Sequence, residues 1–287
     1  MASDVLSAIR SSMGTFSKGQ KRIAGYILES YDKAAFMTAS KLGQTAQVSE
    51  STVVRFASEL GFDGYPEMQR ALQEVVRNRL TSVQRIEVAN GQFADQDLVS
   101  AVIQSDINTL RMTNESLDRA ALSAAVDAII GAKQVYIVGV RSSAAIATFI
   151  DFYLRILLPN VRLVSSTSTG EMLEQLMHLQ PGDTVLGISL PRYSSRTVKA
   201  LNFCRKNGAK IIAVTDHQQA PIAKLADLVL IAKSDMLSFV DSLVAPLSVA
   251  NALVVAISRK LGMELSQSME DLEKIWAQYN VYEHIDN

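Results

Sequence analysis

The chain has 287 residues, of which 48% are hydrophobic, with 28 Lys and Arg against 29 Asp and Glu, a formal net charge of −1. This length suits two domains with sizeable cores. A net charge near zero gives no strong overall field for nucleic acid, although a dimeric regulator needs only a local basic face. The single cysteine, Cys204, excludes an intrachain disulfide or a thiolate metal cluster and favours a reducing compartment.

The chain starts MASDVLSAIR, with an early acidic residue and no apolar segment typical of a signal peptide. The apolar run SVANALVVAIS (248–258) is too short to span a bilayer and predicts a buried helix. We therefore expect a cytoplasmic protein with no membrane partner.

Residues 1–79 show helical periodicity and nothing typical of a strand. Ser17 and Gln20 have the spacing of a capping box, which marks a helix start. Gly61 is placed to end one helix, and Pro66 suits the first turn of the next. The expected helices cover residues 17–30, 38–46, 49–60 and 66–75.

Residues 80–96 lack a periodic apolar face and predict a linker or a loosely packed connector. Helical spacing returns from Asp97 to Leu110, and a further helix is expected over 116–131.

After residue 131 the sequence pattern changes to short runs rich in β-forming residues, separated by helical segments. Each run is continuously apolar, as expected for strands buried on both faces of a parallel sheet. Strands that alternate with helices predict right-handed crossovers and a doubly wound sheet. A long helix (239–261) and an acidic, aromatic tail follow. The five predicted strands are 134–140, 161–165, 183–189, 210–216 and 227–233.

The stretch TASKLGQTAQVSESTVVRFASEL (38–60) predicts two helices joined by a short turn. In the second helix, Val53, Phe56, Ala57 and Leu60 form one apolar stripe. The polar face, with hydroxyls and one arginine, suits a helix that enters the major groove of DNA. The alternative is an ordinary helical hairpin whose polar face meets water. The candidate DNA-binding residues are Ser49, Ser51, Thr52 and Arg55.

The sequence VSESTVVRF, followed by LGFDGYPEMQ, resembles the N-terminal domain of the RpiR family of bacterial transcriptional regulators. The similarity extends over about the first 80 residues and includes FSKGQKRIAGYILE (16–29). It implies that the candidate residues above lie on a recognition helix that reads operator DNA.

Hydroxyl side chains follow four successive predicted strands. Ligands of open α/β sheets bind beyond the carboxyl ends of the strands. The first loop offers Arg141, Ser142 and Ser143 at a predicted helix start, which suits an anion. The later strands are followed by SSTSTGE (165–171), by the loop 189–197 and by Thr215. Together they predict a site for a phosphate or carboxylate.

These loops resemble those of the sugar isomerase (SIS) domain, a phosphosugar-binding fold that forms the C-terminal half of RpiR-type regulators. By resemblance, Ser143 matches the serine of the G-x-G-x-S loop. In the S-x-S-G-x-T loop, Ser189 matches the first serine, Ser194 or Ser195 the second, and Thr197 the threonine.

Two arginines depart from the family pattern. Arg141 replaces the second glycine of the first loop, and Arg192 lies in a lengthened second loop. One hypothesis is that they read an extra anionic group, such as the carboxylate of a phosphorylated sugar acid. The alternative is that one or both form a salt bridge at a subunit interface.

An aldose–ketose isomerase needs a positioned base. Isomerases of the SIS group often carry an acidic residue two positions after the loop threonine, where this chain has Lys199. Other candidate bases are Glu171, Glu174, His178 and His217, each of which also has a structural explanation. We therefore expect no enzymatic activity, no cofactor and no metal.

The predicted fold is an all-α helix-turn-helix domain plus an α/β SIS domain with a doubly wound, flavodoxin-like, parallel five-stranded sheet. The predicted function is a DNA-binding regulator, a repressor of carbohydrate catabolism genes that a phosphorylated sugar controls, acting on double-stranded operator DNA as a homodimer or homotetramer. A phosphosugar isomerase with an accessory helical domain is the alternative. The predicted boundaries are 1–79 (helix-turn-helix), 80–115 (linker and connector helix), 116–265 (SIS) and 266–287 (tail).

Overall fold

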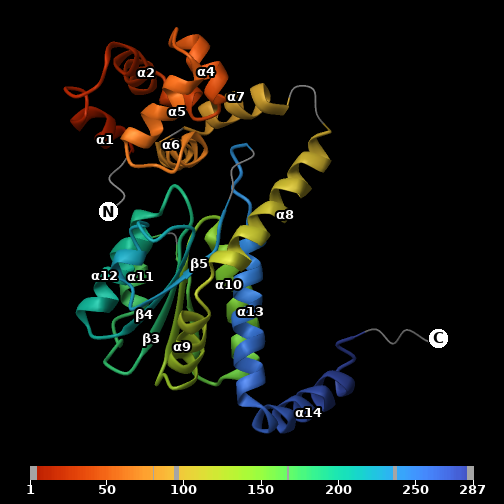
Figure 1. Cartoon of the computed structure of the whole chain (residues 1–287). Coiled ribbons are helices and arrows are strands. Elements are labelled where there is room, and N and C mark those ends of the chain that lie inside the picture. Colours follow the sequence, from red (N-terminus) through yellow and green to blue (C-terminus); the bar gives the residue numbers. More distant parts are fainter. Residues whose placement is uncertain (1–4, 80, 94–96, 167, 235–237, 283–287) are drawn as a thin grey trace. The chain divides into compact units, whose positions relative to one another are not determined.

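The computed structural model describes residues 5–79, 81–93, 97–166, 168–234 and 238–282 (Figure 1). Within these ranges the chain divides into two units. The first comprises residues up to 102 together with 238–241, and the second comprises residues 103–234 and 242–282. Each unit is described by itself below.

The first unit is helical, and the long helix α8 passes from it into the second unit. The helices are α1 Val5–Ser11, α2 Lys18–Glu29, α3 Tyr31–Ala34, α4 Ala39–Thr45, α5 Glu50–Glu59, α6 Tyr65–Arg79, α7 Ser82–Phe93 and α8 Leu98–Ser116.

Side-chain caps set the helix starts in this unit. The predicted capping box of α2 is formed: the backbone N–H of Ser17 donates to Gln20 Oε1 at 2.8 Å, and that of Gln20 donates to Ser17 Oγ at 3.4 Å. Thr38 caps α4 and Ser49 caps α5 in the same way. Gly61 follows the end of α5 with φ of 88°, a left-handed conformation that favours glycine.

The core of the first unit joins the predicted apolar stripe of α5 to its neighbours. Val53, Phe56 and Ala57 are fully buried. A methyl group at Gly43 would lie 2.9 Å from the carbonyl oxygen of Val48, so glycine lets α4 approach the turn closely. The hairpin therefore depends on backbone contact as well as on apolar burial.

The second unit alternates strands and helices. Its strands are β1 Val135–Gly139, β2 Val161–Val164, β3 Thr184–Ile188, β4 Lys210–Thr215 and β5 Leu228–Ile231. Its helices are α9 Arg119–Ile130, α10 Ser143–Leu157, α11 Thr169–Gln175, α12 Ser195–Lys206, a 3₁₀ turn Ala223–Leu225, α13 Val244–Leu261 and α14 Met263–Gln278.

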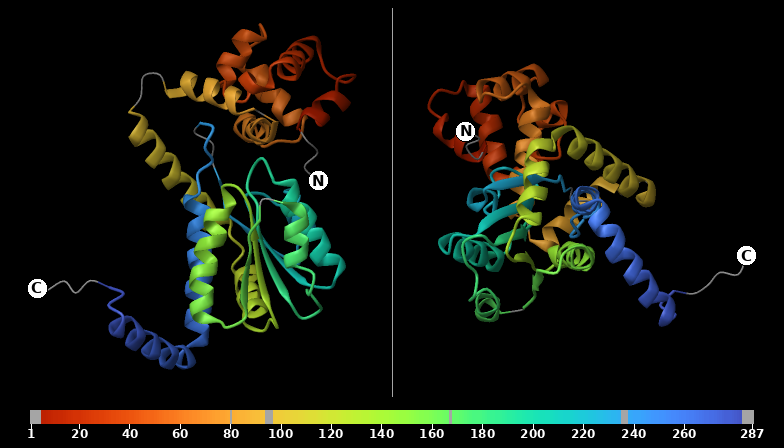
Figure 2. Two further views of the ribbon diagram at one scale, coloured as in Figure 1. Left: turned by 180° about the vertical axis from the view of Figure 1, so that it is seen from behind. Right: turned by 90° about the horizontal axis from the view of Figure 1, so that it is seen from below.

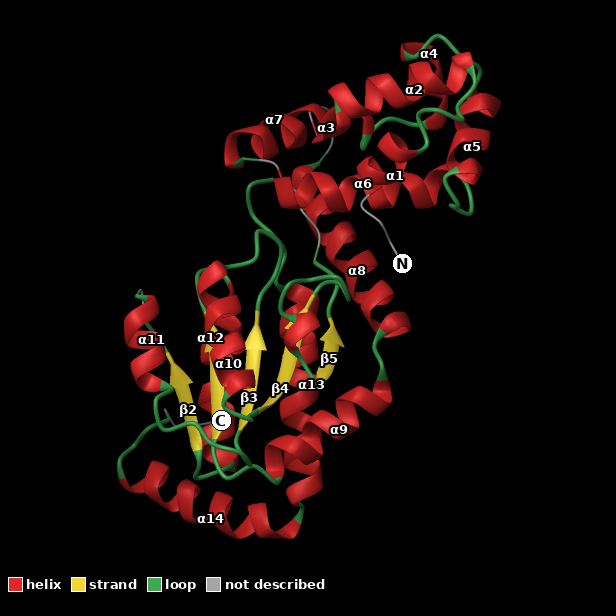
Figure 3. Ribbon diagram, turned by 90° about the vertical axis from the view of Figure 1, so that its left-hand side faces the viewer, coloured by secondary structure: helices red, strands yellow, loops and turns green. Residues whose placement is uncertain are grey.

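The five strands form one parallel sheet in the order β2-β1-β3-β4-β5 (Figure 3). This is the doubly wound, flavodoxin-like order, so the predicted fold class is confirmed. Every residue of β1 and β3 is buried, in accord with their continuously apolar sequences.

Helices cover both faces of the sheet (Figure 2). Alternate strand residues pack on α9, α10 and α13 on one face, and on α11, α12 and the 3₁₀ turn on the other. Cys204 lies buried on α12 within the second of these layers.

Three segments differ from the sequence-based predictions. Residues 82–93, expected as a loose connector, form α7, whose buried Arg85 has Nη1 2.8 Å from a carboxylate oxygen of Asp241, also in the first unit. Because this ion pair anchors α7, the helix has no periodic apolar face that its sequence could display. The helix expected over 239–261 starts at Val244, and the expected tail contains α14.

Among the described residues, α13 is the one helix long and apolar enough by length and composition to cross a membrane, with 18 residues. Seven of its side chains are buried, and it packs beside α10 as a core helix of the sheet. The helix is longer than the apolar run 248–258 from which it was predicted. Its packing against the sheet agrees with the predicted buried helix.

The C-terminal part of α8 is tied to the segment that follows β5. Ser242 Oγ donates to Asp106 Oδ1 at 2.5 Å. The backbone N–H of Lys233 donates to Thr113 Oγ1 at 2.9 Å. The end of the sheet therefore holds α8 through polar contacts within the second unit.

Candidate functional site

The polar face of α5 presents the four residues predicted to contact DNA. Ser49 Oγ accepts from the backbone N–H of Thr52 and lies 2.9 Å from Ser51 Oγ. Arg55 is exposed, and its Nε donates to the carbonyl of Ser51 at 3.3 Å. The helix start is thus pre-ordered, with hydroxyls and one guanidinium on its solvent side.

The start of α2 packs beside the start of α5. A methyl group at Gly19 would lie 3.4 Å from Val48 Cγ1 and 3.6 Å from Thr52 Cγ2. Lys18 and Lys21, on either side of this glycine in the sequence, are exposed. Sequence reasoning missed these two lysines; their position in the first turn of a capped helix was the available signal.

The turn between α4 and α5 contains a second feature that the sequence did not reveal. Gln47 has φ of 53°, a left-handed conformation uncommon for residues with a side chain. It is the one described residue of this turn in that region, and it lets the chain reverse within a few residues.

In the second unit, the loops after β1 and β3 leave the sheet from adjacent positions. Gly139 and Ile188 are register partners at the carboxyl ends of these two parallel strands. This is the point at which the strand order reverses, because β1 is the second strand in the sheet and β3 the third. Both loops lead directly into helices, α10 and α12.

The start of α10 carries the first predicted loop. Ser143 is 4% exposed, whereas Arg141 and Ser142 are exposed. A methyl group at Gly139 would lie 2.8 Å from the carbonyl oxygen of Ser143, so glycine is needed for α10 to pack this close. Arg141, at the family's second glycine position, has φ of 58°.

The start of α12 carries the second predicted loop. Ser194 is the N-cap and Ser195 the first helical residue; the first is half-buried and the second exposed. Thr197, in the same helical turn, is fully buried. Its Oγ1 has no hydrogen-bond partner among the residues that the structure describes. A buried hydroxyl in this state is unusual in a native structure.

The two helix starts also lack side-chain caps. Within the described ranges, neither Ser142 on α10 nor Ser194 on α12 makes a side-chain cap hydrogen bond. By contrast, Ser17, Thr38 and Ser49 cap helices of the first unit. Backbone N–H groups at an uncapped helix start, with the positive end of the helix dipole, suit an anion.

The lengthened part of the second loop is anchored. Pro191 is buried, and the Tyr193 hydroxyl donates to Asp216 Oδ1 at 2.9 Å. Thr215 Oγ1 donates to the carbonyl of Ser189 at 2.7 Å, so the end of β4 holds the start of the loop. Arg192, in the same loop, is exposed and has φ of 62°.

Lys199 and the four candidate bases lie at defined positions in the structure, and Glu174 is exposed on α11. Lys199 is exposed on α12, and His178 is exposed after α11. The carboxylate of Glu171 accepts a hydrogen bond from Ser166 Oγ. His217 Nδ1 accepts from the backbone N–H of Gln219 at 3.0 Å. None of the described ranges brings together three His, Cys, Asp or Glu side chains that could hold a metal ion.

Two family models match the chain. The helix-turn-helix domain of the RpiR family matches residues 3–79, and the SIS domain matches residues 128–256. The transcriptional regulator HexR of Escherichia coli K12 is 26% identical, with 94% of this chain and 93% of HexR covered.

Two solved structures extend the comparison. The sugar isomerase domain of an RpiR transcription factor from Sphaerobacter thermophilus is 30% identical, with a TM-score of 0.59, and covers 62% of this chain and 99% of its own. Vibrio vulnificus NanR, solved with ManNAc-6P, shares the fold at 22% identity and a TM-score of 0.59 over 96% of this chain and 98% of its own. The chain belongs to the RpiR family of transcriptional regulators, with an N-terminal helix-turn-helix region and a C-terminal SIS domain.

Proposed function

We propose that the chain is a cytoplasmic repressor whose affinity for operator DNA is controlled by a phosphorylated sugar or sugar acid. The effector binds where α10 and α12 start. The buried hydroxyl of Thr197 is the observation that carries the proposal, because it has no protein partner among the described residues. A bound phosphate oxygen would accept its hydrogen bond, and the uncapped helix starts would donate backbone N–H groups.

The class of ligand follows from the donors around this position. Ser143 and Ser189 are buried, while Ser142, Ser194 and Ser195 lie at the helix starts. Hydroxyl and amide donors at two neighbouring helix starts suit one phosphate group. The fold shared with NanR, which was solved with the phosphosugar ManNAc-6P, agrees with this class.

Arg141 and Arg192 would read a second anionic group. Both are exposed residues in left-handed backbone conformations, one in each loop of the proposed site. A left-handed conformation costs a residue with a side chain about 1 kcal/mol or more, and it persists where the surroundings impose it. We propose that these guanidinium groups bind the carboxylate of a phosphorylated sugar acid.

Isothermal titration calorimetry tests the ligand class. One probe is a sugar phosphate without a carboxylate, and the other is a phosphorylated sugar acid with the same number of carbon atoms. Arg141→Ala should weaken binding of the sugar acid about tenfold or more, because a charge-assisted hydrogen bond contributes about 1.5–3 kcal/mol. Binding of the sugar phosphate without a carboxylate should change little. Equal affinities of the variant and the wild type for both probes would refute the role of Arg141.

On the DNA side, we propose that α5 enters the major groove. Ser51 and Thr52 would bond phosphates or base edges, and Arg55 would reach a guanine. Lys18 and Lys21 would contact phosphates beside it. A symmetric dimer would read two half-sites one or more helical turns apart.

Mobility-shift assays separate these roles. Arg55→Ala should relax sequence specificity, whereas Lys21→Ala should weaken binding to all sequences and reduce its salt dependence. Identical effects of the two variants on specific and non-specific DNA would contradict the assignment.

The alternative isomerase requires a base at the effector site. Lys199 occupies the position at which the resemblance expects an acid, and an ordinary lysine is protonated at neutral pH. Glu171 is exposed and engaged by Ser166. We propose that the site binds without turnover. Measurable isomerisation that disappears in Glu171→Gln would favour the enzyme.

A further inference from the structure

Helix α14 has little to pack against in its own chain. None of its described side chains is buried, and Ile275 is 50% exposed. Leu265, Met269, Leu272 and Trp276 recur on one face at helical spacing. An isolated helix of 16 residues is marginally stable in water, so this apolar face requires a partner.

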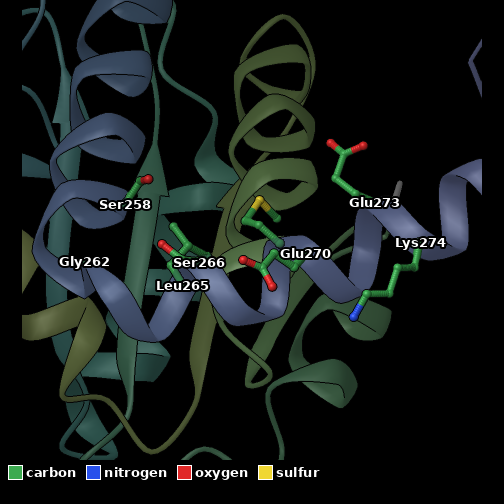
Figure 4. A pocket seen from close by; sticks show the side chains of 8 residues that line it. Ser258, Gly262, Leu265, Ser266, Glu270, Glu273 and Lys274 are labelled. Carbon is green, nitrogen blue, oxygen red and sulfur yellow. The ribbon is translucent and has the colours of Figure 1, made fainter.

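Among the described residues, the main contact of α14 with the domain is with the end of α13. Figure 4 shows the open groove between them, lined by Ser258 of α13 and by Leu265, Ser266 and Glu270 of α14. Gly262 joins the helices with φ of 55° and ψ of −127°, a conformation that strongly favours glycine. This glycine turns α14 away from the line of α13 (Figure 1).

The chain after α14 folds back on it and extends the apolar surface. The rings of Trp276 and Tyr282 meet edge to face, with centroids 5.3 Å apart, and the backbone N–H of Val281 donates to the carbonyl of Trp276 at 3.0 Å. Tyr279, which lies between Trp276 and Tyr282 in the sequence, is 70% exposed, and Tyr282 is 61% exposed. The arm, defined as residues 263–282, therefore ends in an exposed aromatic cluster.

The same unit presents an uncovered apolar face on α10 and α13, which pack side by side over one face of the sheet (Figure 2). Phe152 and Tyr153 of α10 are 58% and 41% exposed, with ring centroids 5.0 Å apart. Leu247 and Val255 of α13 are 39% and 57% exposed. Clustered exposed apolar side chains of this size mark an interaction surface.

The arm and this face carry opposite charges. Helix α14 has four acidic side chains, among them Glu270, Asp271 and Glu273, and one basic side chain. Helices α10 and α13 together have three basic side chains and one acidic side chain, Asp151, which is buried and pairs with Arg155. Lys260 of α13 likewise pairs with Asp127 of α9. The α10–α13 face therefore keeps a small net positive charge, carried by the exposed Arg259.

We propose that the arm docks on the α10–α13 face of a second copy of this chain. One chain carries both complementary surfaces, so two copies related by a twofold axis cover both arms and both faces in a closed assembly. The arm is then an exchanged element that holds the regulator together as a dimer, or as the dimeric half of a tetramer.

Analytical ultracentrifugation of full-length variants tests this exchange without DNA or effector, so its result is independent of the proposed function. The arm variant is Ile275→Asp with Tyr279→Asp, and the face variant is Phe152→Asp with Val255→Asp. All four side chains are at least half exposed, so the fold should tolerate the changes. Met177→Asp, at a position 65% exposed on the opposite layer, is the matched control.

We expect the wild type and the control to sediment at two or four times 31.3 kDa. Arm and face variants should each weaken assembly about tenfold or more, because apolar anchors dominate such interfaces. Mixing the two variants should restore part of the assembly, since the intact arm of one chain meets the intact face of the other.

Three results would overturn the proposal. The first is a monomeric wild type. The second is an unchanged mass in either variant. The third is the absence of recovery on mixing, which is the result expected if the arm folds over its own chain.

Discussion

Replacing Thr197 by valine should have opposite effects on stability and on effector binding. The Thr197 hydroxyl is fully buried, and without a ligand it has no hydrogen-bond partner among the described residues. Valine has nearly the same shape and removes the buried polar atom. The substitution should therefore stabilise the free protein while it removes a donor to the bound phosphate.

The magnitudes follow from general values for buried hydroxyls. An unsatisfied buried polar group costs about 1–3 kcal/mol, so we expect a gain near the lower end of that range for the effector-free protein. For a domain of this size, 1 kcal/mol corresponds to about 2–4 °C in Tm. A hydrogen bond to a charged group contributes about 1.5–3 kcal/mol, which predicts an affinity lower by about tenfold to 150-fold.

Differential scanning calorimetry without effector and titration calorimetry with a sugar phosphate measure the two effects. Thr197→Ser is the control, because it keeps the hydroxyl and should change affinity less. A Thr197→Val protein that is destabilised in the free state and binds effector with wild-type affinity would refute the assignment of this hydroxyl.

Three further predictions concern residues packed inside one unit or the other. Gly43→Ala would place a methyl group 2.9 Å from the carbonyl oxygen of Val48, so it should destabilise the helix-turn-helix by about 1–3 kcal/mol and weaken DNA binding while effector binding persists; unchanged thermal unfolding would contradict this. Burial raises the pKa of the Cys204 thiol to about 12. The thiol should therefore react with a disulfide reagent at pH 8 only after denaturation, and rapid reaction of the native protein would contradict the burial. Burial also raises the pKa of Tyr65 to about 12, and its hydroxyl donates to the carbonyl of Met37 at 2.5 Å. Because a raised folded pKa stabilises only while the group stays protonated, this contribution is complete below pH 10 and is lost as the pH rises from 10 to 12. Urea unfolding should show that loss in the wild type and not in Tyr65→Phe, which should itself lose about 1 kcal/mol at neutral pH.

The fold was largely predictable because its signals are local. Strands buried on both faces produce continuous apolar runs, and these located all five strands of the sheet. Caps such as Ser17 and Ser49, and the left-handed Gly61, mark helix ends with side-chain and backbone chemistry that the sequence displays directly. Hydroxyls after successive strands also pointed to the end of the sheet where the candidate anion site lies.

The remainder depends on contacts between distant parts of the chain. Helix α7 buries an arginine against a carboxylate more than 150 residues away, so it has no periodic stripe to detect. The left-handed backbone at Arg141 and Arg192 runs against the usual preference of arginine. The partnerless hydroxyl of Thr197 becomes visible only when its neighbours are placed.

Fluorescence anisotropy on the protein's own upstream DNA, with a panel of sugar phosphates and phosphorylated sugar acids, tests the central claim most directly. We predict that the wild type binds this DNA at physiological salt and that one phosphorylated sugar in the panel releases it. Arg55→Ala should lose specific binding, and Thr197→Val should bind DNA but need a higher effector concentration for release. Binding that no member of the panel changes, or release that proceeds equally in Thr197→Val, would contradict the account.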